Sequence, residues 1–419
     1  MYSRGVIALA VSAALGLPCP AGAQVPAQTG GPRGENAFNP GISLILNGTY
    51  ANLSQDPTGF RIDGFVPTLG EAGPPKRGLS LGESELAISA NVDHYFRGAA
   101  TVALTPENEA DIEEAFVQTL ALSNGFTAKA GRFFSGVGYL NEFHPHAWDF
   151  TDAPLANKVF LGQQLGEDGV QVKWVAPTDF YLDIGAEMGK GRQFPSGSDR
   201  NKNGSGSGSL FTHIGGDMGT GTAWQAGLSY LSTTAKDRTY DDVDSTGTPV
   251  TNSFAGKSRL WALSGVLKWA PNRNPTDTNF KLQGEFFQRR ESGDLTFDTG
   301  AATAAGTLTG GYSSIQSGMY LQGVYQFVPQ WRVGYRYDRL DSGTTKIDLV
   351  DSGTLAAADF PILAAYNPTR NTLMVDWSGS EFSRVRLQFA QDKSRSDATD
   401  KQVFVQYIMS LGAHGAHKF

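Results

Sequence analysis

After residue 40, about sixteen two-faced segments follow one another, and the connectors between them alternate between short and long. One set of connectors is minimal, as in Asn124-Gly125 and Pro329-Gln330, whereas the other set includes 135–168, 236–257, 291–310 and 341–368. A soluble antiparallel sheet has no reason to keep all its tight turns at one end. A barrel that spans the bacterial outer membrane does, with short periplasmic turns and long extracellular loops.

The segments alternate in hydrophobicity, as the strands of such a barrel must. Successive side chains of a strand point to opposite faces, so one face meets lipid and the other meets the lumen. In 382–392, the apolar Val385, Leu387 and Phe389 alternate with Arg384, Arg386 and Gln388. The fold class predicted for 41–419 is therefore all-β: a transmembrane antiparallel β-barrel of about 16 strands with short periplasmic turns and long extracellular loops.

The N-terminal residues have the pattern of a secretory signal peptide. Arg4 precedes an apolar run over 6–17, and small residues at 21–23 suggest cleavage near Ala23. We expect 1–23 to be removed, leaving 24–40 as a short periplasmic segment and the barrel in the cell outer membrane of a Gram-negative bacterium. The only cysteine, Cys19, falls inside this signal, so the mature chain is expected to lack thiol chemistry.

A barrel of this size suggests a channel. Sixteen strands enclose a water-filled space, whereas active receptors have about 22 strands and a globular plug. Residues 24–40 are too few for a plug, which favours passive diffusion of small hydrophilic solutes. The net charge of −7 does not indicate the positively charged surface that nucleic-acid-binding proteins use. No cofactor is expected, and an outer-membrane hydrolase is the less favoured alternative because no nucleophile–base pair stands out.

Charged residues of both signs occupy the face predicted to line the pore. Opposed rows of charge would create a transverse field that orients solutes and gives a modest anion preference. The alternative is that these charges only keep the lumen solvated. The predicted pore-lining residues are Glu83, Glu85, Arg97, Lys173, Lys281, Glu285, Arg332, Arg336, Arg384 and Arg386.

His144-Pro145-His146 has the residue types of a zinc or copper site, with Glu142 and Asp149 nearby. A metal-binding protein or metal transporter is therefore an alternative function. Pro145 restricts the two imidazoles from reaching one ion. A structural loop is the favoured interpretation, with Trp148 and Phe150 packing against the wall.

The stretch Lys129-Ala130-Gly131-Arg132-Phe133-Phe134 runs into the long connector 135–168. With this stretch and its architecture, 41–419 resembles the sixteen-stranded porins, most nearly the phosphate-selective porin O/P group and its uncharacterised proteobacterial relatives. The resemblance implies a homotrimer in outer-membrane lipid. It also implies that 135–168 folds inward as a constriction, to which we assign Phe143, Trp148, Asp149 and Phe150. We expect the three aromatic side chains to pack against the inner wall. The row of basic side chains that is expected along the lumen of a phosphate-selective channel is not evident here.

The apolar stretch 355–366 lies in a predicted extracellular loop. Free exposure of so many apolar residues would favour aggregation. We therefore expect this stretch to cover the barrel mouth or to be buried in a subunit contact.

Overall fold

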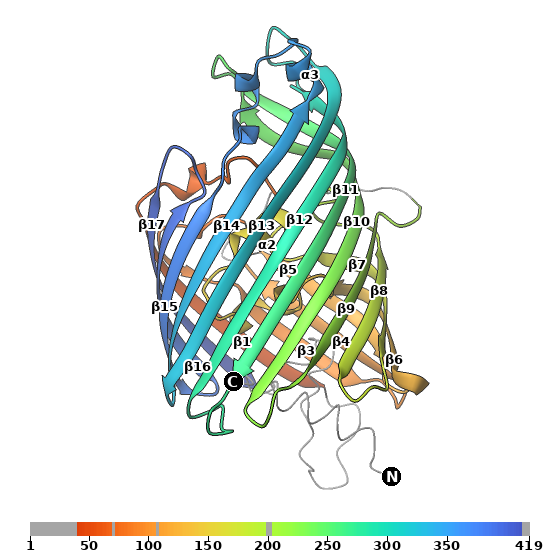
Figure 1. The fold of residues 1–419 in the computed structure, drawn as a ribbon, viewed down its shortest axis with the longest axis vertical. Coiled ribbons are helices and arrows are strands. Elements are labelled where there is room, and N and C mark those ends of the chain that lie inside the picture. Colours follow the sequence, from red (N-terminus) through yellow and green to blue (C-terminus); the bar gives the residue numbers. More distant parts are fainter. Residues whose placement is uncertain (1–39, 69–71, 106–108, 198–202, 413–419) are drawn as a thin grey trace.

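The structure, a computed structural model, describes residues 40–68, 72–105, 109–197 and 203–412. The predicted signal peptide, the segment 24–40 apart from Pro40, and the C-terminal Phe419 lie outside these residues. The described chain forms one closed antiparallel sheet (Figure 1). Its strands are β1 (Gly41–Leu53), β2 (Gly78–Leu81), β3 (Ser84–Asn91), β4 (Phe96–Leu104), β5 (Ala110–Thr119), β6 (Phe126–Phe134), β7 (Gly166–Val175), β8 (Tyr181–Gly189), β9 (Ser207–Asp217), β10 (Thr222–Val243), β11 (Pro249–Trp269), β12 (Asn279–Phe297), β13 (Leu308–Val328), β14 (Trp331–Ile347), β15 (Thr369–Ser380), β16 (Ser383–Lys393) and β17 (Asp400–Gly412).

The seventeen segments make sixteen barrel strands. Both β2 and β3 pair with β1, and only residues 82–83 separate them, so together they act as one interrupted strand. Each later strand pairs with the next, and β17 pairs with β1, where Ser43 lies opposite Gly412. The predicted sixteen-stranded barrel is confirmed.

The helices are short and lie in the connectors. Among the described residues, no helix has both the length and the hydrophobicity needed to cross a membrane. The helices are α2 (Leu155–Leu161), α3 (Asp348–Asp351), and the 3-10 helices η1 (Pro57–Gly59), η2 (Ser123–Gly125), η3 (Leu140–Glu142), η4 (Pro145–Ala147), η5 (Ala357–Asp359) and η6 (Pro361–Leu363).

The barrel wall is apolar outside and polar inside. Leu373 and Phe389 are each 47% exposed, whereas their chain neighbours Thr372 and Gln388 are almost fully buried. A soluble protein would reverse this distribution. Lipid requires it, because every backbone polar group must pair within the sheet while apolar side chains face outward. The chain is an outer-membrane β-barrel.

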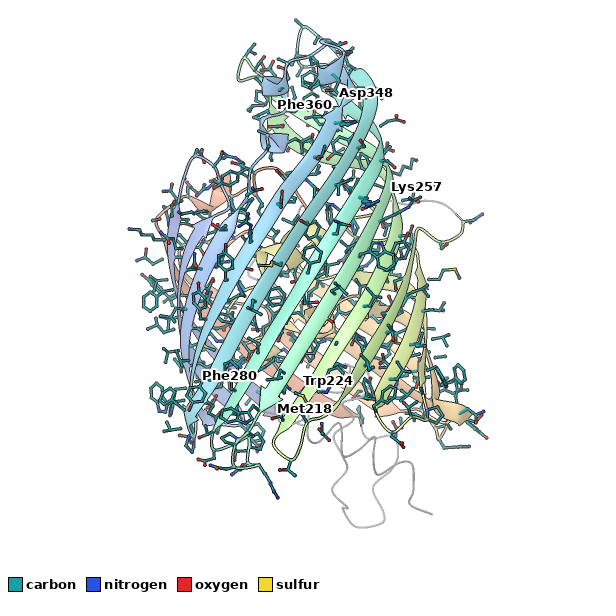
Figure 2. The ribbon with its side chains drawn as sticks, in the orientation of Figure 1. Met218, Trp224, Lys257, Phe280, Asp348 and Phe360 are labelled. Atoms are coloured by element: carbon teal, nitrogen blue, oxygen red, sulfur yellow. The ribbon has the colours of Figure 1, made fainter. Side chains whose placement is uncertain are left out.

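Aromatic side chains gather at the end with the tight turns. Trp331 and Trp377 face outward from paired strands with their ring centroids 6.4 Å apart, and Trp224 and Phe280 lie near the same end in Figure 2. Indole and phenyl rings at this height suit the boundary between lipid and water. The first and last described strands also begin and end here, as the parity of the connectors predicts.

The opposite end of the barrel is uneven, which corrects two predicted loops. Residues 236–257 and 291–310 are largely continuations of β10–β13, and only 244–248 and 298–307 remain as connectors. A membrane strand needs about ten residues, but β10 has 22 and β11 has 21. The extra length projects beyond the rest of the barrel (Figure 1).

The projecting strands are stabilised by the apolar stretch between β14 and β15. Phe360 is buried, and its ring centroid lies 5.5 Å from that of Phe297 on β12. Ile362 and Leu363 join the same apolar cluster, which includes Phe254. The large apolar side chains Phe360, Ile362 and Leu363 are thus buried against the same chain, whereas residues 356–358 and 364–365 are exposed.

Candidate functional site

The connector between β6 and β7, residues 135–165, lies inside the barrel, and we call it the lumen loop. Its helix α2 has seven residues, all of them buried, and packs against β12, β13 and β14 (Figure 1). Phe160 stacks on Phe287 of β12 at 5.9 Å and meets Phe65 edge-on. The helix ends at Gly162, whose φ of 65° favours glycine. The loop therefore has its own apolar core within the barrel.

Carboxylates of the wall bind the first residues of the lumen loop. Ser135 and the backbone N–H of Gly136 donate to Glu187 of β8. The backbone N–H of Tyr139 donates to Glu285 of β12 at 2.6 Å. Each of these buried carboxylates satisfies a loop donor that has lost contact with water. Glu285, which was predicted to line the pore, faces the lumen side and anchors the loop there.

Asp149 is the first of two ion-pair centres on the loop. It accepts hydrogen bonds from Lys281 of β12 at 3.0 Å and from Arg332 of β14 at 3.1 Å. Arg332 also forms a bidentate pair with Asp376 of β15. Burial alone would raise the pKa of Asp149, but Lys281 and Arg332 outweigh it and hold that pKa well below its ordinary value.

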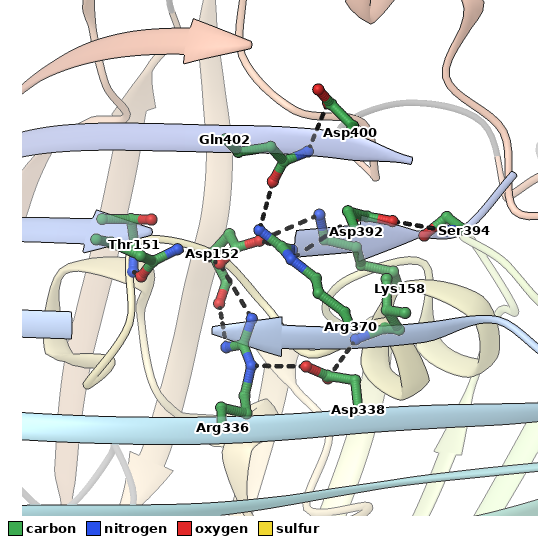
Figure 3. A network of polar contacts seen from close by, with 12 residues as sticks. Thr151, Asp152, Lys158, Arg336, Asp338, Arg370, Asp392, Ser394, Asp400 and Gln402 are labelled. Atoms are coloured by element: carbon green, nitrogen blue, oxygen red, sulfur yellow. Dashed lines mark hydrogen bonds and ion pairs between the residues drawn. The ribbon is translucent and has the colours of Figure 1, made fainter. Parts of the chain in front are cut away.

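Asp152 forms the second centre, which Figure 3 shows. Its carboxylate pairs with Arg336 of β14 at 3.1 Å, with Arg370 of β15, and with Lys158 of α2 at 3.6 Å. Gln388 of β16 also donates to it. Burial would raise the pKa of Asp152, but the cations Arg370 and Arg336 lower it strongly. The loop is thereby fixed to three strands of one wall.

Two further arginines hold the loop by its backbone. Arg384 donates to the carbonyl oxygen of His146, and Arg386 donates to that of Trp148 at 2.9 Å. Arg336 and Arg386 are each only 1% exposed. The four predicted pore-lining arginines of this wall all face the lumen and contact the loop: Arg332, Arg336, Arg384 and Arg386.

The histidines of the loop meet carboxylates on another part of the wall, on β3 and β5. His144 Nδ1 lies 3.2 Å from both Glu85 of β3 and Glu113 of β5, and its Nε2 lies 3.1 Å from Glu114. His146 Nδ1 lies 2.8 Å from Glu85. Burial would lower the pKa of His144, but the carboxylates raise it well above its ordinary value.

This grouping differs from the one that the sequence predicted. Asp149 binds cations instead of joining the histidines, and Glu142 is not part of the group of possible metal ligands that includes His144. The carboxylates beside His144 include Glu113 and Glu114 of β5, in place of Glu142 and Asp149.

The aromatic residues assigned to the constriction divide into two kinds. Phe150 packs against the wall, in a buried cluster with Val324 and Met374. Phe143 and Trp148 instead pack within the loop, and the Trp148 indole N–H donates to the Phe143 carbonyl oxygen at 2.8 Å. The prediction that they pack against the inner wall is therefore wrong, because the loop is large enough to form its own apolar cluster.

The remaining predicted lumen residues lie apart from these centres. Lys173 of β7 pairs with Asp183 of β8 at 3.4 Å, and Glu83 lies in the break between β2 and β3. Arg97 is buried on β4, and its backbone lies opposite that of Asn91 on β3.

Several site residues escaped the sequence analysis. Arg370 alternates with apolar residues in 369–380, so the period of two could have found it. Asp152 lies in irregular structure and Lys158 in the short helix α2, where no strand period applies. Only their three-dimensional contacts identify Asp152 and Lys158 as site residues.

Acid is expected to loosen the lumen loop. Because the folded pKa values of Asp149 and Asp152 lie below the ordinary 3.8, their stabilising contribution is complete above that value and is lost as pH falls below it. We expect single-channel conductance to stay constant from about pH 7 to about pH 4 and to rise below that. Bilayer recordings across this range check it, and a rise that is complete above about pH 5 would contradict the assignment.

Comparisons with known proteins agree with the architecture. No protein-family model matches the chain. An uncharacterised protein of Aquifex aeolicus is 31% identical over 414 residues, which cover 93% of this chain and 81% of that protein. Among solved structures, a loop-deletion mutant of OmpT, an outer membrane protein of Vibrio cholerae, superposes with a TM-score of 0.54 at 11% identity, covering 90% of this chain and all of that one. An anion-selective porin from Comamonas acidovorans gives 0.52 at 11% identity, covering 89% and 99%.

Proposed function

We propose that this chain, which belongs to one family with the uncharacterised Aquifex aeolicus protein, is an outer-membrane porin through which small hydrophilic solutes diffuse passively. The observation that carries the proposal is a closed sixteen-stranded barrel whose inner face bears charges and whose lumen loop crosses the interior. A barrel of this strand number is wide enough for an aqueous path, and an inward loop sets the size of solute that passes.

A modest anion preference is part of the proposal. Strands β14–β16 carry more loop-facing cations than carboxylates, whereas Glu85, Glu113 and Glu114 lie on β3 and β5. The cations are Arg332, Arg336, Arg370, Arg384 and Arg386, and the carboxylates are Asp338, Asp376 and Asp392. Such a separation of charge creates a field across the passage that acts on ions according to their sign. The fold shared with the Comamonas acidovorans porin, which is anion-selective, is consistent with this preference.

The finer grouping and the assembly are also proposals. The stretch 129–134 and the architecture support a relationship to the phosphate-selective porin O/P group, but the lumen arginines are engaged by the loop instead of forming a free ladder. We therefore propose the architecture of that group without phosphate selectivity. One similar structure, of OmpT from Vibrio cholerae, is a trimer form, and we propose a homotrimer in outer-membrane lipid.

Planar-bilayer recording tests the function. Wild-type protein is expected to give discrete conductance steps and, under a salt gradient, a reversal potential that indicates anion preference. Replacing Arg384 and Arg386 together by Ala should shift the reversal potential toward cations, because two lumen cations are lost while Asp376 remains.

Arg290→Ala is the matched control, because Arg290 is exposed on the outer face of β12 and should leave the reversal potential unchanged. Absence of any ion conduction by the folded wild-type barrel would refute the channel. Equal reversal potentials for wild type and the double variant would refute the role of the two arginines.

A further inference from the structure

We propose that His144, Glu85 and Glu113 form a binding site for one divalent transition-metal cation of the zinc class, inside the barrel. One ligand atom from each of these three residues lies within 4.8 Å of the others. They come from three parts of the chain: the lumen loop, β3 and β5. Imidazole nitrogen and carboxylate oxygen are donors that zinc accepts, whereas calcium and magnesium prefer oxygen alone.

A β-bulge aims one of these ligands at the site. In a regular strand, consecutive residues face opposite sides, so Glu113 would face lipid if Glu114 faced the lumen. The register against β4 shifts here: Thr101 pairs with Glu114, but its neighbour Val102 pairs with Ile112. Glu113 is the extra residue, and both glutamates contact His144. Bulges commonly redirect side chains at functional sites.

The spacing of the donors suits a small tetrahedral ion. His144 Nδ1 is 3.2 Å from an oxygen of Glu85 and 3.2 Å from an oxygen of Glu113. Zinc–ligand bonds of about 2.0–2.1 Å at tetrahedral angles separate neighbouring ligand atoms by about 3.3–3.4 Å. The imidazole nitrogen therefore already lies at close to the required separation from an oxygen of each carboxylate.

The far nitrogen of His144 has the partner that a metal-bound histidine requires. Nε2 lies 3.1 Å from Glu114, which is buried and also accepts the backbone N–H of Phe134. A carboxylate in this position fixes the tautomer that leaves Nδ1 free to bind metal, and it increases the basicity of the imidazole. Glu114 is thus a positioning residue for the proposed site.

The charges of the pocket also favour a dication. Glu85, Glu113 and Glu114 carry three negative charges, and Lys129, whose charge acts on Glu114, offsets one of them. The remaining negative charge can be neutralised by two protonated histidines, or by one divalent cation while both histidines are neutral. The second imidazole, His146, stacks on His144 and hydrogen-bonds to the other oxygen of Glu85, which orients that carboxylate.

A bound cation would fasten the lumen loop on its second side. The ion pairs of Asp149 and Asp152 hold the loop to the strands that bear the arginines, and the metal would link it to β3 and β5. This consequence for conduction rests on the proposed porin function. The binding itself does not.

The test is calorimetric titration of Zn²⁺ into the full chain, folded in detergent without an affinity tag and first treated with a chelator. One zinc ion is expected to bind per chain. Glu113→Gln should weaken zinc binding more than about 100-fold, and Glu114→Gln by about 10–100-fold. Glu142→Gln, which changes a carboxylate on the same loop outside the site, should leave the affinity unchanged.

Heat-dependent gel mobility confirms that each variant retains its barrel, so that a loss of binding reports on the site. Failure of the folded wild type to bind Zn²⁺, or equal affinities for wild type and Glu113→Gln, would overturn the metal site. Bilayer recordings separate this outcome from the porin proposal. Ion conduction without zinc binding refutes only the site, and zinc binding without conduction refutes only the channel.

Discussion

Deleting residues 141–156 is expected to raise the single-channel conductance several-fold and to make the channel more strongly anion-selective. The deletion removes the part of the lumen loop that crosses the interior, including Asp149 and Asp152. The five arginines of this wall that contact the loop or its carboxylates would then face water. They would outnumber the three carboxylates left on the same strands, Asp338, Asp376 and Asp392. Fewer obstacles raise conductance, and unpaired cations attract anions.

Conductance steps and reversal potentials in a planar bilayer measure both effects. The control is a deletion of the same kind outside the lumen, at residues 245–247 in the turn between β10 and β11. This change should leave both quantities at their wild-type values. Unaltered conductance after deletion of 141–156 would show that the loop does not limit the passage of ions.

Replacing Asp152 by Asn is expected to lower the free energy that holds the lumen loop by about 3–5 kcal/mol. Asp152 is the shared partner of Arg336, Arg370 and Lys158, and all three cations are almost fully buried. Asp338 and Asp392 still pair with Arg336 and Arg370, but the buried network then holds three cations against two carboxylates. An uncompensated buried charge costs far more than losing a surface pair. We expect lower resistance to urea in detergent micelles and a noisier, larger channel current.

Asp397→Asn is the matched control for the Asp152 variant. Asp397 pairs with Arg61 in a 3.0 Å contact but is 63% exposed. Exposed pairs contribute less than about 1 kcal/mol, so this variant should resemble wild type. Equal urea midpoints for the two variants would show that the network around Asp152 does not hold the loop.

The membrane strands were predictable because lipid imposes one rule on every residue that it touches. Outward residues such as Leu387 and Phe389 must be apolar, so the period of two appears directly in the sequence. Above the membrane this rule no longer applies. The upper parts of β10 and β11, with Asp241, Asp242 and Asn252, therefore looked like loops, although their backbones pair as regular strands.

The contacts of the lumen loop were not predictable for a different reason. Asp152 and Arg370 are 218 residues apart, and Trp148 and Arg386 are separated by 238. No local pattern records which wall a loop will meet. The bulge at Glu113 is likewise invisible in a single sequence, since one extra residue in a strand changes no composition. For this loop, the sequence predicted only that it folds into the barrel, and that prediction came from the resemblance to porins.

The closure of the sheet between β1 and β17 has a consequence for assembly. The lumen loop leaves β6, yet its ionic partners are on β14, β15 and β16, near the other end of the chain. The ionic contacts of the loop can form only once β14, β15 and β16 have taken their places in the cylinder. The same late strands that close the cylinder carry the arginines that lock its contents, so sealing and locking become one event.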